Sequence, residues 1–132
     1  MIEGWHGDDY LLLFDGAEAA AFSARYELGR FLAGYSLIGL RGWDDFIVKD
    51  ANGQFATVPT VPMSVEYLVP LDISIDASRM EADDRFRGRV KWHRNPLVFG
   101  GSPTDKENIV WVPLEQHVDL VKFWNGCYHR LK

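Results

Sequence analysis

Cysteine, an excess of basic charge and long apolar runs are all missing from this sequence. Cys127 is the single cysteine among 132 residues, so the chain cannot form an internal disulfide, which is typical of a reducing compartment. No apolar run approaches the roughly 20 residues that a membrane-spanning helix needs. Residues 1–6 lack the basic region and apolar stretch of a signal peptide. We therefore expect a cytoplasmic protein without a membrane partner.

The charge balance argues against nucleic acid as a partner. Fourteen basic and nineteen acidic residues give a formal net charge of −5. An acidic surface repels phosphate backbones and favours encounter with a basic protein. At 47% hydrophobic residues, with five Trp, five Tyr and eight Phe, the chain has ample material for a core. Its length fits one domain, residues 1–132.

The histidines do not have the spacing of a metal site. No pair shows the i,i+4 spacing of a helical zinc motif, and no cysteine pair accompanies them. His117 and His129 are separated by about 18 Å of helical rise, too far to share an ion. We therefore expect no metal and no cofactor. The four histidines of the sequence are His6, His93, His117 and His129.

Two further segments contain residue types that take part in catalysis or phosphate binding in other proteins. Cys127 and His129 are two residues apart, so in a helix they point to different faces and cannot form a catalytic pair. Gly100–Ser102 resembles a phosphate-binding loop, but the lysine and the Ser/Thr of that motif are missing. We expect a turn there, with residues 104–108 held by side-chain-to-backbone hydrogen bonds. The sequence therefore predicts no catalytic residue.

The hydrophobic periodicity predicts two helices, over residues 17–32 and 113–130. In the second helix we expect one apolar stripe to face the core, with Cys127 buried and inert. That stripe consists of Leu120, Trp124, Cys127 and Leu131, widened by Val121 and Tyr128.

Short strands with turn residues between them make up the rest of the prediction. Asn52-Gly53 between two β-rich runs indicates a hairpin. Residues 72–89 are expected to form a solvated loop with one helical turn. Because the strands follow one another without intervening helices, we predict an α+β fold, a mainly antiparallel sheet with helices packed on one side. The expected strands are 9–14, 36–40, 45–50, 54–58, 65–71, 90–93, 97–99 and 109–112.

Two acidic pairs are the candidate partner-binding residues. Neighbouring residues in a strand face opposite sides, so neither Asp8-Asp9 nor Asp44-Asp45 forms an acid–base dyad. Trp43 stands beside the second pair. An exposed Trp there would be an interface anchor, whereas a Trp43 packed in the core would leave only solvated acids. The candidate contact therefore comprises Trp43, Asp44, Asp45, Asp8 and Asp9.

Several short motifs resemble the SUKH superfamily of Smi/Knr-type proteins. They are the run from Glu3-Gly4 to Phe14, Arg25-Tyr26, the stretch 33–39, Lys49–Gly53, and the segment from 99 through Trp111 and His117 to 125. The usual first helix of the family is missing, and its glycine-rich segment is replaced by residues 39–45.

The resemblance implies a non-enzymatic role. Bacterial members are regarded as immunity proteins that neutralise a polymorphic toxin, often a nuclease, by direct binding. An acidic domain suits a basic toxin of that kind. One alternative is a small hydrolase-like enzyme in which the fold brings Asp and His together. Another is a structural subunit of a larger assembly.

Overall fold

The computed structural model describes residues 1–42, 45–71 and 75–131. Three α-helices are present there, α1 (Gly16–Arg25), α2 (Leu28–Phe31) and α3 (Leu114–Arg130). Within the same ranges, no helix is both long enough and apolar enough to cross a membrane. Four single 3₁₀ turns are η1 (Val65–Tyr67), η2 (Ala77–Arg79), η3 (Leu97–Phe99) and η4 (Lys106–Asn108). The strands are β1 (Ile2–His6), β2 (Asp9–Leu13), β3 (Ser36–Arg41), β4 (Asp45–Lys49), β5 (Phe55–Pro59), β6 (Val69–Pro70), β7 (Arg89–His93) and β8 (Ile109–Pro113).

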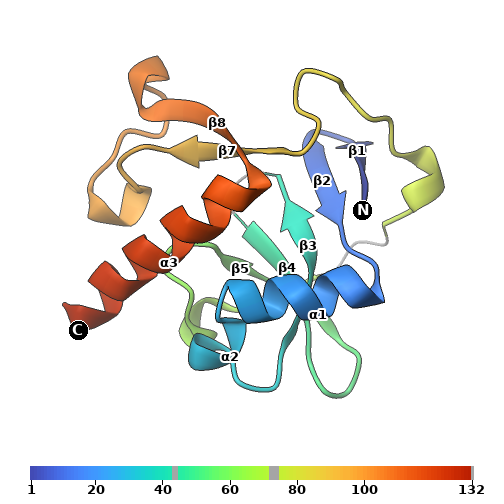
Figure 1. Ribbon diagram of the computed structural model, residues 1–132, viewed down its shortest axis with the longest axis horizontal. Coiled ribbons are helices and arrows are strands. Elements are labelled where there is room, and N and C mark those ends of the chain that lie inside the picture. The colour runs from blue at the N-terminus through green and yellow to red at the C-terminus, as the bar shows by residue number, and fades with distance from the viewer. Residues whose placement is uncertain (43–44, 72–74, 132) are drawn as a thin grey trace.

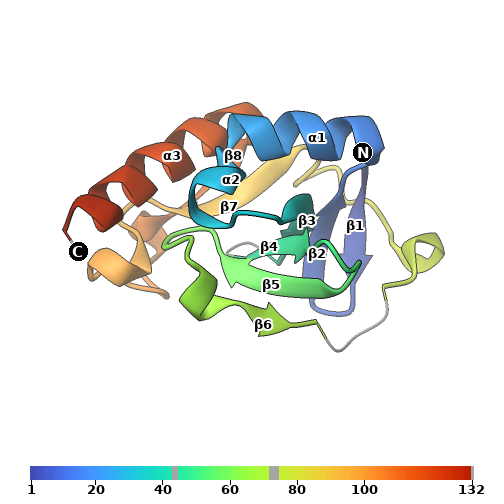
Figure 2. The same ribbon diagram turned by 90° about the horizontal axis from the view of Figure 1, so that it is seen from below.

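The fold class is α+β, as the sequence predicts. Strands β1 to β6 form an antiparallel sheet in sequence order, and β7 pairs with β8 in a second antiparallel sheet. The helices lie along one side of the larger sheet (Figures 1 and 2). Because neighbouring strands alternate in direction, the β1–β2 and β3–β4 connections and the end of β5 all lie at one end of this sheet.

The core lies between the helices and the larger sheet. Phe46 and Val48 on β4 and Val118 and Val121 on α3 are fully shielded from solvent. Strand alternation places Phe46 and Val48 on the same face. The other buried members of this core are Tyr10, Leu12, Phe14, Tyr26, Leu28, Leu32, Leu37, Leu40, Val58, Met63, Val90, Trp92, Val112 and Leu114.

The predicted hairpin is confirmed. Strands β4 and β5 pair in register from Asp45–Pro59 to Lys49–Phe55. Asp50 organises the turn, because its carboxylate accepts hydrogen bonds from the amides of Asn52 and Gln54, each at 2.9 Å. The preference of Asn-Gly for a hairpin turn depends on local backbone geometry, so contacts from distant segments do not change the prediction here.

The prediction of one helix over 17–32 is wrong, because α1 ends at Arg25 and α2 starts at Leu28. Asp15 and Glu18 form a capping box at the start of α1. At the other end Glu27 adopts a left-handed conformation with φ of 57°. Tyr26 is buried there and bonded to His117, so tertiary contacts override the helical pattern.

Two predicted strands are also corrected. Residues 97–99 form the turn η3, closed by the Phe99 amide donating to the Pro96 carbonyl. Within 65–71 only β6, Val69–Pro70, is a strand, and it follows the turn η1. Proline lacks an amide donor, which limits pairing at this sheet edge. The helical turn expected within 72–89 is confirmed as η2.

The predicted core stripe of the last helix is confirmed only in part, because Val121 is buried and Leu120 and Trp124 pack against the core, while Leu131 and Cys127 are not buried. Leu131 is 77% exposed and Cys127 is only half-buried, with Arg130 Nη2 donating to Cys127 Sγ at 3.4 Å. The buried face also includes the polar residues His117 and Asn125, whose hydrogen bonds compensate for their burial. The other buried residues of α3 are Leu114, Val118 and Val121.

Candidate functional site

An open pocket lies where β5, β7 and the segments that follow them meet. It has a volume of about 380 Å³, within the usual range for ligand pockets. The bond between Val61 and Pro62 in its wall is cis. We call it the proline pocket and define it by its lining residues, Asp45, Pro59, Thr60, Val61, Pro62, Tyr67, Trp92, His93, Pro96, Leu97 and Val98.

The proline pocket is mainly apolar and has an exposed apolar rim. Tyr67, Leu97 and Val98 are each at least 40% exposed, while Trp92 and His93 are buried in its inner wall. Asp45 supplies the carboxylate of the lining. An apolar cleft with a few polar groups is the usual form of a binding site. Such a site has room for an aliphatic or aromatic side chain, with the acidic residue Asp45 in its lining.

Helix α3 fixes one wall of the proline pocket. The Asn125 side chain accepts a hydrogen bond from the Met63 amide at 2.7 Å and donates to the Thr60 carbonyl at 2.7 Å. Nε2 of His129 lies 3.0 Å from the Met63 carbonyl oxygen. Asn125 is completely buried, so these bonds form away from solvent. They hold segment 60–63 in one conformation.

A second set of bonds fixes the opposite wall. The Asn108 side chain accepts from the Asn95 amide at 2.8 Å and donates to the carbonyls of Asn95 and Ser102. Ser102 Oγ accepts from the Asp105 amide at 3.0 Å. A side chain at Gly101 would collide with the Asn95 carbonyl, 1.8 Å from the ideal Cβ position. The predicted turn with side-chain-to-backbone bonds is therefore confirmed, and it positions Pro96–Val98.

The inner wall continues into a buried aromatic cluster. The Trp92 and His117 rings meet edge to face at 5.4 Å, and the Tyr26 hydroxyl lies 2.7 Å from Nδ1 of His117. Burial lowers the pKa of His117 to about 3, so the imidazole is neutral, and burial raises the pKa of Tyr26. Within the described residues, Nε1 of Trp92 and Nε2 of His117 make no hydrogen bond. This cluster is structural and does not open onto the pocket through His117, which is fully buried.

The predicted acidic residues lie at the same end of the sheet. Asp8 is exposed in the β1–β2 turn, Asp9 begins β2 and Asp45 begins β4. Arg41 pairs with Asp45 in the strand register, and its Nε lies 3.2 Å from Oδ2 of Asp9. An ideal Cβ on Gly42 would lie 3.2 Å from the Asp9 carboxylate, so the two turns are neighbours. We call Asp8, Asp9 and Asp45 the acidic end.

The structure thus brings three of the five predicted residues to one end of the sheet, and Asp45 belongs to both the acidic end and the proline pocket. Trp43 and Asp44 lie outside the described residues. Sequence patterns did not indicate the other pocket residues. Those residues come from separate segments. Hydrophobic periodicity is a local pattern, so it does not indicate that Pro59 and Trp92 lie close together in the fold.

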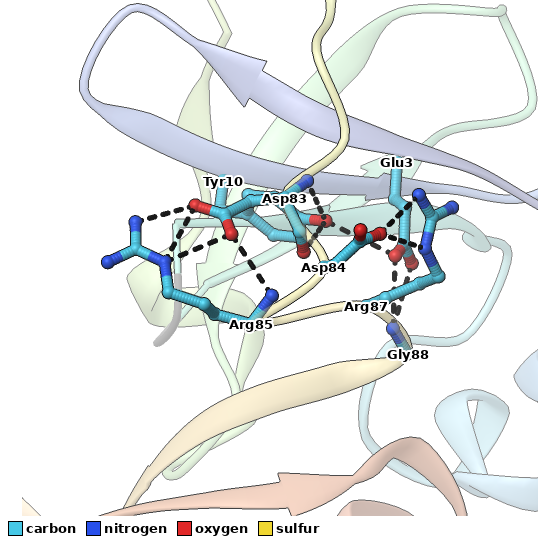
Figure 3. Close-up of polar contacts among 7 residues, drawn as sticks. All are labelled: Glu3, Tyr10, Asp83, Asp84, Arg85, Arg87 and Gly88. Atoms are coloured by element: carbon cyan, nitrogen blue, oxygen red, sulfur yellow. Dashed lines mark hydrogen bonds and ion pairs between the residues drawn. The ribbon is translucent and has the colours of Figure 1, made fainter.

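A buried glutamate joins β1 to the segment before β7. Glu3 accepts hydrogen bonds from the Tyr10 hydroxyl at 3.2 Å and from the Gly88 amide at 3.1 Å, and the Asp83 amide donates to the Tyr10 hydroxyl (Figure 3). Burial raises the pKa of Tyr10. This clamp sets where β7 begins, and so where Trp92 stands in the pocket wall.

The exposed side of the same segment is rich in ion pairs. Arg85 Nη2 lies 2.7 Å from Asp83 Oδ2, and the Trp5 indole donates to the same oxygen at 3.1 Å. The hydrogen bond from Arg85, followed by that from Trp5, holds the pKa of Asp83 well below its usual range. Arg87 pairs with Asp84 at 2.9 Å (Figure 3). Because these charges are satisfied locally, the segment is a structural connection.

Among the described residues, no group of three or more His, Cys, Asp or Glu side chains is arranged to hold a metal ion. Comparison with known proteins found no matching family model, no matching curated protein and no matching solved structure.

Proposed function

We propose that this chain is a non-enzymatic protein-binding module, an immunity protein of the SUKH type that acts in the cytoplasm and neutralises a basic toxin by direct contact. One observation carries the proposal. The acidic end and the proline pocket share Asp45, so a group of acidic side chains lies beside an apolar pocket that can hold an anchoring side chain. This combination fits a protein surface better than a nucleic acid or a membrane.

The two parts of the site have different roles in binding. The acidic end attracts a basic surface and speeds encounter. The proline pocket then receives one side chain from the partner, and its desolvated apolar walls slow dissociation. A lysine or arginine suits it, because the aliphatic stem packs on Tyr67 and Trp92 while the cationic head lies near Asp45. Covering the toxin's active site in this way requires no chemistry from the chain.

Co-expression with a candidate toxin tests this proposal. The candidate is the basic domain of a large secreted protein encoded beside this chain in its own genome. We expect co-expression to restore growth and the two proteins to form a stable complex. Leu97→Asp, at the pocket rim, should abolish protection. Phe55→Asp is the matched control, since Phe55 is similarly exposed (46% against 44%) but begins β5, at the other end of the sheet.

The outcomes separate binding from folding. Both variants should melt close to the parent, because surface substitutions usually change the free energy of unfolding by no more than about 0.5 kcal/mol. Loss of protection in both variants, or in neither, would argue against the pocket as the contact. Failure of the unmodified chain to bind any such basic domain would contradict the proposed function itself.

A second candidate is a small hydrolase, favoured by the presence of Asp45 and His93 in the same pocket lining. A His supported by a carboxylate is a common general base. Ester, amide and phosphoester substrates are the appropriate probes. Turnover that disappears in both Asp45→Asn and His93→Gln would favour the enzyme, while equal background rates in parent and variants would favour the binding module.

A further inference from the structure

Helix α3 carries an apolar stripe that the rest of the chain covers only in part. Phe123 is 59% exposed, and Leu120, Trp124 and Cys127 are half-buried. Trp124 contacts Phe99 at 5.1 Å on one side and Phe123 at 5.3 Å on the other. An apolar stripe of this kind on a helix marks an interaction surface. We call these four residues of α3 the outer stripe.

Charged residues are placed symmetrically beside the outer stripe. Asp119 and Arg130 are both exposed and lie eleven residues apart, about three helical turns, so they occupy the same flank of α3. The hydrogen bond from Arg130 to Cys127 Sγ places the guanidinium at the stripe. No ion pair involves Asp119 or Arg130 within the described ranges. Trp124 lies midway between these opposite charges.

We propose that the chain pairs with a second copy of itself through the outer stripe, with the two α3 helices antiparallel about a twofold axis near Trp124. In that arrangement Asp119 of each copy faces Arg130 of the other, because both lie on the same flank at equal distances from the axis. In this arrangement the positive end of each helix dipole lies near the negative end of the other, which also favours the dimer. Phe123 of each copy then faces Gly126 of the other, where an added Cβ would meet no atom within 4 Å beyond its chain neighbours and the backbone of its own helix.

The charge pattern favours a second copy over another kind of partner. A surface that carries one acid and one base at equal distances from its centre is complementary to itself. A purely basic toxin surface would be attracted by Asp119 but repelled by Arg130, so it would complement only half of this pattern. The acidic end is built on other elements, whereas Phe99, next to Leu97 and Val98 of the pocket rim, contacts Trp124, so the outer stripe adjoins the proline pocket.

Sedimentation of the full chain at rising concentration tests the pairing. We expect the mass to double from that of one chain to that of two. Phe123→Asp should keep the chain monomeric. Asp119→Arg and Arg130→Asp should each weaken the dimer about tenfold, since two pairs become repulsive together. The double variant Asp119→Arg/Arg130→Asp should restore the dimer, because the swapped charges again face each other.

Each alternative result overturns the inference. A parent chain that stays monomeric at all concentrations would exclude the pairing, and a dimer unaffected by Phe123→Asp would place the interface elsewhere. A double variant that stays as weak as the single ones would exclude the antiparallel arrangement. Thiol labelling of Cys127 provides a second readout. It should slow as the parent dimerises and be independent of concentration in Phe123→Asp, and melting curves should show that all variants are folded.

Discussion

The hydroxyl of Tyr26 and Nδ1 of His117 lie 2.7 Å apart in the interior, joining the end of α1 to α3. The two rings also meet edge to face, with centroids 5.7 Å apart. This contact explains why the chain turns at residues 26–27 and why the buried face of α3 includes a histidine. It also makes stability dependent on pH.

The first prediction is that His117 weakens the folded state in acid. Burial lowers its pKa from 6.5 to about 3, so between these values the unfolded chain binds a proton that the folded chain excludes. The free energy of unfolding should therefore rise with pH across this range, by up to about 1.4 kcal/mol per pH unit from this group. Urea titrations of the parent and of His117→Asn at a series of pH values measure the difference. Equal slopes in the two proteins would contradict the prediction.

The second prediction concerns the partner of that histidine. Tyr26→Phe removes the hydroxyl and leaves Nδ1 of His117 buried without a hydrogen bond, which should lower the free energy of unfolding by about 1–3 kcal/mol. In a double-mutant cycle with His117→Phe, the two losses should not add, because both substitutions remove the same bond. Denaturant midpoints provide the four stabilities, and strict additivity would show that the bond contributes nothing.

The third prediction is that Asn125 maintains the proline pocket. Asn125→Ala removes its bonds to Met63, Thr60 and Val121, which should cost about 3 kcal/mol because buried backbone groups are left unpaired. Hydrogen exchange at the Met63 amide should accelerate. Asn52→Ala, in the exposed hairpin turn, is the control and should change stability by less than about 0.5 kcal/mol. Unchanged exchange at Met63 would show that another contact holds the segment.

The fourth prediction tests the clamp that positions β7. A Cβ at Gly4 would lie 2.7 Å from the backbone of Glu81, so Gly4→Ala must push that segment away. We expect a loss of about 1–3 kcal/mol, the usual cost of overpacking, and faster exchange of the Gly88 amide. Gly16→Ala is the matched control, since nothing lies within 4 Å of its ideal Cβ. If the Gly4→Ala protein were as stable as this control, the segment around Glu81 would not be packed tightly enough against Gly4 to position β7.

Local signals in the sequence were sufficient for part of the fold. The Asn52-Gly53 hairpin and the turn over 104–108 depend on neighbouring residues, and both are confirmed. The run of consecutive strands was likewise enough to indicate the antiparallel sheet. By contrast, the break at Glu27 results from the burial of Tyr26 against a residue 91 positions away, which no local pattern records.

The outer stripe shows why hydrophobic periodicity misled on α3. The pattern indicates Leu120, Val121, Trp124 and Cys127 as core residues. Val121 is buried, but Leu120 and Trp124 pack against the core only in part, and the helix also buries His117 and Asn125. These polar side chains find hydrogen-bond partners in distant segments, so burying them costs little. The same limit applies to the pocket. Asp45 was identified from the acidic pair, whereas His93 and Tyr67 reach the site only through the tertiary fold.

Association kinetics with the basic partner domain, measured at low and high salt, test the central claim most directly. Asp8→Asn/Asp45→Asn removes two charges at the acidic end, and Glu27→Gln/Asp84→Asn removes two elsewhere. We expect the first pair to slow association several-fold at low salt and to flatten its salt dependence, and the second pair to leave the rate and its salt dependence nearly unchanged. Equal effects of the two pairs, or an association rate of the parent that does not respond to salt, would contradict this expectation.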